Sequence, residues 1–155
     1  MTMRAFAAVL LALLLASCAT SRSGAPPAPS RTAPEDILGV RLNMPRAEVR
    51  TALAERGKFE REERKQQEIW TVDDPRFASL IVGYDPDWTV RYVTAVAKPE
   101  GAPVRYADVL DVAGAEHKNA GATHTYTWPA GKYYVIAIGG PEKLEYLSLK
   151  KDPSR

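Results

Sequence analysis

Four short turn sequences divide most of the chain into apolar runs that are too short for helices and suit β-strands. They are Asp-Asp-Pro at 73–75, Asp-Pro-Asp at 85–87, Pro-Ala-Gly at 129–131 and Gly-Gly-Pro at 139–141. Asp bonds to nearby backbone amides and Pro fixes φ, so both residues favour turns. Connections this short join antiparallel neighbours, so the sequence predicts two three-stranded antiparallel meanders. The predicted strands are 68–73, 77–84 and 88–97 in the first half, and 123–128, 132–139 and 143–151 in the second.

A helix is predicted before each group of strands. The first covers 45–56, where Pro45 is tolerated in the first turn and Gly57 suits the position after the last turn. The second covers 104–113, and Gly114 would end it. The apolar faces consist of Val49, Ala52 and Leu53 in the first helix, and of Tyr106, Val109, Leu110 and Ala113 in the second. Residues 58–68 are expected to form a solvated loop or the exposed start of a strand, and residues 117–122 a loop.

The two halves therefore repeat the same order of elements. Trp70 matches Trp128 and Tyr92 matches Tyr146, at similar spacings. We expect an α+β fold made of two helix-plus-three-stranded antiparallel-sheet repeats, over residues 35–99 and 100–152. Neither half is large enough to bury a stable hydrophobic core by itself. The two halves are therefore expected to share an interface or a continuous sheet.

The first residues have the pattern of a secretory signal. A short positive segment, 1–4, precedes twelve uncharged residues, 5–16. A membrane-spanning helix needs about 20 apolar residues, whereas a run of this length is typical of the central region of a signal peptide. We therefore predict a signal peptide over 1–17.

Cys18, the only cysteine, follows this segment directly and has no partner for an internal disulfide. Leu15, Ala16, Ser17 and Cys18 resemble the bacterial lipobox, a branched apolar residue and two small residues before a cysteine. The resemblance implies cleavage before Cys18 and a diacylglyceryl group on its thiol, and acylation of the new amino terminus would make the anchor stable. The alternative is cleavage after small residues by the general signal peptidase, in which Cys18 has no role. Ala19 rather than Asp after the cysteine resembles the sorting rule for the outer membrane.

Residues 18–34 are predicted to be the lipidated N-terminus and a disordered tether. The stretch 21–34 is rich in proline and serine and has little that could pack in a core.

The charge pattern and the candidate reactive groups exclude several function classes. The chain has 21 basic and 19 acidic residues without a basic stripe, so no nucleic-acid partner is expected. His117 and His124 are two imidazoles where zinc sites use three or four ligands, so no metal site is predicted. No nucleophile motif appears, and we predict no catalytic residue and no cofactor. Four acids are candidates for a carboxylate pair that cleaves glycosides, although they lie in charged loop or turn segments where solvation is the usual explanation: Glu62, Glu63, Asp73 and Asp74.

Aromatic residues allow two interpretations. They either fill the core between helix and sheet or form a contact surface on one sheet face, where Trp and Tyr are enriched in interfaces. Tyr133 and Tyr134 are consecutive and must point to opposite faces of their strand. The other members of this group are Trp88, Tyr126 and Trp128.

The segment 43–49 resembles the start of the small bacterial domains of the BamE-like (SmpA/OmlA) lipoproteins and of the β-lactamase-inhibitor-protein (BLIP) fold, a tandem of two such units. Met44 and Val49 correspond to the methionine and valine of their Gly-Met-Thr/Ser-x-x-Val signature, with one additional residue before Val49, whereas Asn43 and Pro45 replace the glycine and the hydroxyl residue. The segment 109–116 resembles the helix exit of the inhibitor repeats. The likeness covers about residues 36–150, although the half-cystines of the inhibitors are missing. It implies a non-enzymatic module that binds another protein, and no partner-contact residue can be carried over.

Together these features predict a lipid-anchored lipoprotein of the bacterial cell envelope, in the outer membrane and facing the periplasm. Its partners would be the membrane, through Cys18, and another envelope protein, in the role of an assembly accessory or a structural lipoprotein. The alternatives are a periplasmic inhibitor of a hydrolase such as lysozyme or a β-lactamase, and an enzyme or small-ligand carrier.

Overall fold

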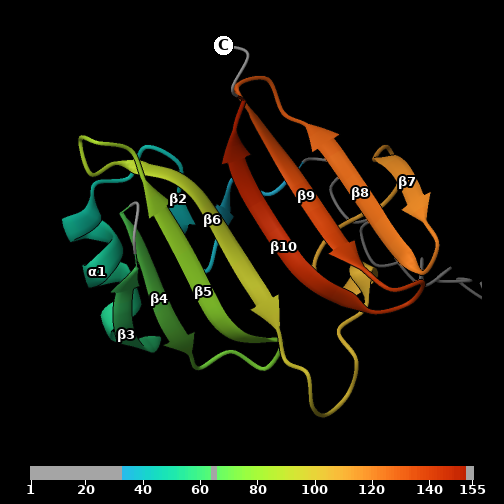
Figure 1. Cartoon of the computed structure of the whole chain (residues 1–155), viewed down its shortest axis with the longest axis horizontal. Helices are drawn as coiled ribbons and strands as arrows, with labels where there is room; N and C mark the ends of the chain where they lie inside the picture. Colours follow the sequence, from blue (N-terminus) through green and yellow to red (C-terminus); the bar gives the residue numbers. More distant parts are fainter. Residues whose placement is uncertain (1–32, 64–65, 153–155) are drawn as a thin grey trace, which may run out of the picture.

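The computed structural model describes residues 33–63 and 66–152, which form mainly β-strands (Figure 1). Eight strands make one antiparallel sheet in the order β3-β4-β5-β6-β10-β9-β8-β7, and β1 pairs with β2 in a separate small sheet. The strands of the large sheet are β3 (Gly57–Glu63), β4 (Gln67–Val72), β5 (Phe77–Tyr84), β6 (Val90–Ala97), β7 (Glu116–Ala120), β8 (Thr123–Pro129), β9 (Tyr133–Gly139) and β10 (Leu144–Lys151). The small sheet consists of β1 (Asp36–Ile37) and β2 (Val40–Arg41).

The predicted α+β class, with two helix-plus-three-stranded repeats, is wrong. The described residues contain one α-helix, α1 (Arg46–Ala54), inside the predicted range 45–56. The second predicted helix, 104–113, is reduced to a 3₁₀ turn at Tyr106–Asp108. The Asp111 carboxylate accepts a hydrogen bond from the Ala113 backbone N–H at 2.9 Å, which takes the donor that a continuing helix would need.

Two further strands lie at the outer edges of the large sheet. Residues 58–68, for which loop and strand start were both open, contain most of β3, and the predicted loop at 117–122 contains most of β7. Every residue of β7 is exposed, and β3 is exposed from its second residue onward. Without a buried side these strands show no apolar alternation, and pairing with β4 and β8 holds them in place.

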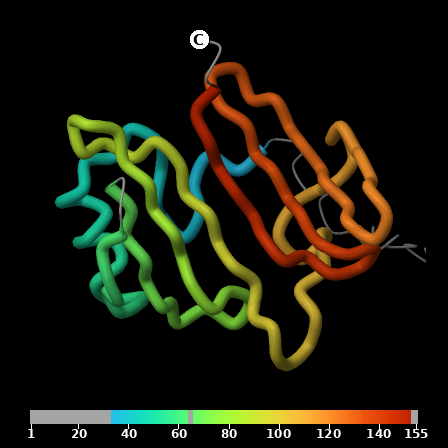
Figure 2. Tube along the Cα trace, in the orientation of Figure 1, coloured from blue at the N-terminus to red at the C-terminus, as the bar shows by residue number. Residues whose placement is uncertain are grey.

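The sheet consists of two four-stranded meanders that meet at β6 and β10 (Figure 2). These two strands pair over five residues of each, from Val96 opposite Tyr146 to Tyr92 opposite Lys150. At the middle of the seam the Thr94 and Ser148 hydroxyls are hydrogen-bonded at 2.8 Å.

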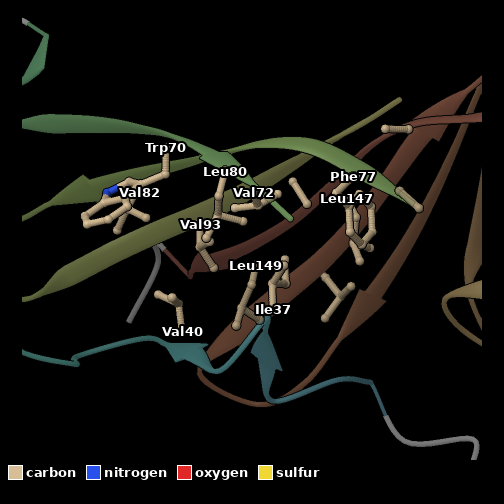
Figure 3. Packing of buried hydrophobic residues seen from close by; sticks show 14 of the residues in the cluster. Ile37, Val40, Trp70, Val72, Phe77, Leu80, Val82, Val93, Leu147 and Leu149 are labelled. Carbon is tan, nitrogen blue, oxygen red and sulfur yellow. The ribbon is translucent and has the colours of Figure 1, made fainter. Parts of the chain in front are cut away.

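One side of the sheet carries the core, which α1, β1 and β2 cover. Figure 3 shows the part of this core between the sheet and Ile37 and Val40. Val49 and Leu53 of α1 are fully buried, and Ile37 and Val40 pack against the central strands. The register aligns core residues across five strands, so that one row consists of Trp70, Leu80, Ala95, Leu147 and Ala137.

The N-terminal predictions fall on residues outside the described part of the chain. These are the signal peptide at 1–17, the lipobox Leu15, Ala16, Ser17 and Cys18, and all but the last two residues of the tether at 18–34. Within residues 33–63 and 66–152, no helix has the length and apolar character needed to cross a membrane.

Candidate functional site

The side of the large sheet opposite α1 carries no other described helix or strand (Figure 1). Because side chains alternate along a strand, the residues between the core positions point to this side. Its central part, which we call the open face, consists of Ile81, Tyr92, Thr94, Val96, Tyr134, Ile136, Tyr146 and Ser148.

Rings, aliphatic side chains and hydroxyls make up the open face. Tyr146 is 42% exposed, a high value for an aromatic residue on a central strand. Tyr92 and Tyr134 are half-buried and flank Lys150 in the register of β6, β10 and β9. Thr94 and Ser148 bind each other through their hydroxyls at the centre. The open face is thus a partly exposed apolar and hydroxyl surface, and none of its eight residues is a carboxylate.

The open face is hollowed at one end of the β6–β10 seam. The depression has a volume of about 360 Å³ and is lined by Tyr92, Tyr134 and Ile136, with basic side chains at its rim. The basic residues are Arg91, Lys150 and Lys151. A second depression, of about 430 Å³, lies at the other end of the seam beside Val96 and Tyr146.

Glu68 on β4 is a fully buried acid on the α1 side of the sheet. Its Oε1 accepts hydrogen bonds from Arg46 Nε at 2.7 Å and from Arg50 Nη2 at 2.6 Å. Its Oε2 accepts from the Tyr84 hydroxyl at 2.9 Å and from Trp70 Nε1 at 3.3 Å. Both arginines come from α1, one helical turn apart, so this acid fixes the helix to the sheet.

These contacts determine the protonation state of Glu68. Burial by itself would raise the pKa of its carboxyl, but the hydrogen bonds from Arg46, Arg50, Tyr84 and Trp70 outweigh burial and hold the pKa below its usual value. Burial, and then the hydrogen bond to Glu68, raise the pKa of Tyr84. Glu68 is therefore an ionised carboxylate with both oxygens occupied, which suits it to a structural role rather than proton transfer.

A cation–π contact extends the Glu68 cluster towards the surface. The Arg46 guanidinium lies 4.1 Å from the centre of the Trp88 ring and also pairs with Glu62. Trp88 adopts a left-handed backbone, with φ of 62°. The sequence signal for this cluster was the pair of arginines four residues apart in α1, together with an acid in line with Trp70 on β4; neither was singled out from the sequence.

The four acids considered for a carboxylate pair lie in ion pairs or turns. Glu62 pairs with Arg46, and Glu63 pairs with Arg61 at 2.8 Å. Asp74 accepts hydrogen bonds from the backbone N–H groups of residues 76 and 77 and caps the β4–β5 turn. The neighbouring Asp73 uses its backbone N–H to bind the Arg56 carbonyl.

The structure brings the two histidines together on neighbouring strands. His117 Nε2 and His124 Nδ1 are 3.0 Å apart and share a hydrogen bond, and the His117 ring stacks on Tyr126. Among the described residues no group of three or more His, Cys, Asp or Glu side chains could hold a metal ion.

The aromatic residues are divided between the two sides of the sheet. Trp128 is buried in the core, and Tyr126 and Trp88 pack against it. Tyr133 packs against the same core, whereas the next residue, Tyr134, lines the depression on the open face. The core interpretation therefore holds for Trp128 and for the three aromatic residues packed against the core, whereas Tyr134 lies on the opposite side of the sheet.

Comparisons with protein-family models, with curated proteins and with solved structures find no match for the chain.

Proposed function

We propose that this protein is a lipid-anchored envelope lipoprotein whose domain binds another envelope protein through the open face. The observation that carries this proposal is an uncovered sheet face with exposed Tyr146, half-buried Tyr92 and Tyr134 and several aliphatic side chains. Contiguous apolar surface of this kind marks interaction sites, and tyrosine is enriched at their centres. Basic residues rim one depression, so the matching partner surface is apolar with carboxylates beside it.

The anchor in this proposal is Cys18, by its position in Leu15-Ala16-Ser17-Cys18 after an apolar segment. A tethered binding module needs no catalytic group of its own. The occupied state of Glu68 agrees with such a role, because a carboxylate with four hydrogen-bonding partners serves the fold.

Co-purification from detergent-solubilised membranes tests the binding surface. The variants are Tyr146→Glu and Ile136→Glu, which place a charge on the open face. The matched control is Val112→Glu, because Val112 is a similarly exposed apolar residue, at 37%, in the segment between β6 and β7. We expect both open-face variants to lose the partner that the wild-type protein and the control retain. Equal capture by all four proteins would contradict the open-face proposal.

The identity of the captured protein decides the role. Capture of an envelope-assembly component supports the accessory role. Capture of a soluble hydrolase that loses activity in the complex would instead show that the protein is an inhibitor.

Membrane attachment has its own experiment. Replacement Cys18→Ser is expected to move the protein from the membrane fraction to the soluble fraction or to leave an uncleaved precursor. Mass spectrometry of the wild-type N-terminal peptide should show the acyl groups. Unchanged processing and unchanged membrane retention of the variant would refute lipidation at Cys18.

A further inference from the structure

A groove of about 510 Å³ lies where three separate segments meet, and Lys151 is the one residue that it shares with the depression on the open face. One wall is the segment 41–43 before α1, and the opposite wall is the β8–β9 turn with the start of β9, residues 130–133. The end of β10 closes the groove between them. This volume is within the range of about 300–1,000 Å³ that small-molecule sites occupy.

The walls of this groove are largely apolar. Leu42 and Tyr133 both pack against the core while remaining partly exposed, and Ala130 lies beside Tyr133 in the turn. Ala130 donates its backbone N–H to the Tyr133 carbonyl at 2.9 Å, which fixes the shape of this wall without using a side chain. A ligand with a hydrocarbon part would therefore bury apolar surface on both sides.

Positive charge predominates at the mouth of the groove. Arg41, Lys132 and Lys151 line it, against a single acid, Glu35. Lys151 pairs with Asp85 on the β5–β6 turn. Arg41 and Lys132 are exposed, and within residues 33–63 and 66–152 neither forms an ion pair with a carboxylate. Two uncompensated cations beside apolar walls favour an anionic head group attached to a hydrocarbon chain.

We infer that this groove binds a monomeric fatty acid, with the carboxylate at Arg41 and Lys132 and the alkyl chain between Leu42 and Tyr133. A guanidinium binds a carboxylate through two parallel N–H···O bonds, and the nearby ammonium adds a third charge-assisted donor. The inference does not depend on the open-face proposal, since the open-face residues Tyr146 and Ile136 do not line the groove.

Isothermal titration calorimetry with octanoate, decanoate and dodecanoate, each below its micelle concentration, tests the inference. Each added methylene is expected to tighten binding about three- to fourfold, because it buries more hydrocarbon. The double variant Arg41→Gln/Lys132→Gln should weaken dodecanoate binding by about tenfold or more. The control Lys58→Gln/Arg61→Gln removes the same charge from exposed positions on β3 and should bind like wild type. Lys132→Glu provides a second test if the double variant folds poorly by circular dichroism.

Several results would overturn the inference. They are no binding of any of the three acids, equal binding of dodecyltrimethylammonium, and unchanged affinity in both groove variants. Binding to anionic vesicles without binding to the monomeric acid would assign the cations to a membrane surface instead. Tyr146→Glu should leave dodecanoate affinity unchanged, so failure of the groove and failure of the open face are measured separately.

Discussion

Replacement Glu68→Gln removes the negative charge at the centre of the Glu68 cluster with little change in side-chain shape. The two arginines then bind a neutral oxygen, and the new amide N–H₂ faces the Trp70 N–H, which loses its acceptor in a site where Trp70 is only 5% exposed. Removing one partner of a buried ion pair costs about 3–5 kcal/mol. The arginine side chains are 23% and 47% exposed and can recover some hydration, so we expect a loss of about 2–4 kcal/mol in the free energy of unfolding.

Urea denaturation at pH 7, followed by circular dichroism and tryptophan fluorescence, measures this loss. The matched control is Glu62→Gln, because Glu62 pairs with the same Arg46 but its side chain is 43% exposed. We expect the control to cost less than about 1 kcal/mol, as exposed ion pairs do. A Glu68→Gln variant within about 1 kcal/mol of wild type, or equal to the control, would refute the assignment of Glu68 as the residue that fixes α1.

The same variant has a pH signature. The pKa of Glu68 is lower in the folded protein than in the unfolded chain, so its stabilisation is complete above the unfolded-state pKa of about 4.3. The stabilisation is lost as pH falls through the folded-state pKa. The difference in unfolding free energy between wild type and Glu68→Gln should therefore be constant around neutral pH and shrink in acid below about pH 4. A difference that grows on acidification would contradict the sign of the shift.

Two other contacts give predictions of their own. A Cβ at Gly83 would lie 2.2 Å from the Tyr92 ring, so Gly83→Ala should cost about 1–2 kcal/mol in wild type and nearly nothing in a Tyr92→Ala background, by thermal unfolding. Equal costs in the two backgrounds would contradict the contact. Asp85 and Lys151 form a half-buried ion pair between the β5–β6 turn and the end of β10, so Asp85→Asn should cost about 1 kcal/mol, and less at high salt. A salt-independent effect on the urea midpoint would count against the ion pair.

The elements that could be predicted are those with a buried side. Helix α1 has Val49 and Leu53 at helical spacing, and β5 and β6 have short turns beside apolar runs, so local pattern and tertiary packing agree. The segment 104–113 shows why this signal fails elsewhere. Its apolar spacing is helical, and Tyr106 is indeed buried, but the helical turn stops at Asp108. The Asp111 carboxylate then takes the Ala113 N–H, which a longer helix would need.

The candidate site was harder to predict because it depends on which side of the sheet is covered. Alternation along a strand shows that Tyr133 and Tyr134 point opposite ways, but not which of them α1, β1 and β2 leave exposed. The burial of Glu68 could not be predicted for a related reason. An acid at the start of a strand is usually solvated, and its burial here requires Arg46 and Arg50 from a different element.

The distribution of charge across the open side supports its use as a binding surface. On the edge strand β3, the residues that face this side are charged, with Lys58, Arg61 and Glu63 in register with β4. The outer strand β7 places Glu116 and Lys118 there. Charged edges discourage strand pairing between copies. If solubility were the only requirement, the central strands would be expected to carry charges throughout. Apart from Lys150 and Arg91 at one depression, their residues on this side are mainly rings, aliphatic side chains and hydroxyls. An apolar centre within a polar rim is the arrangement of a protein interface, so we expect the partner to lie across β5, β6, β10 and β9.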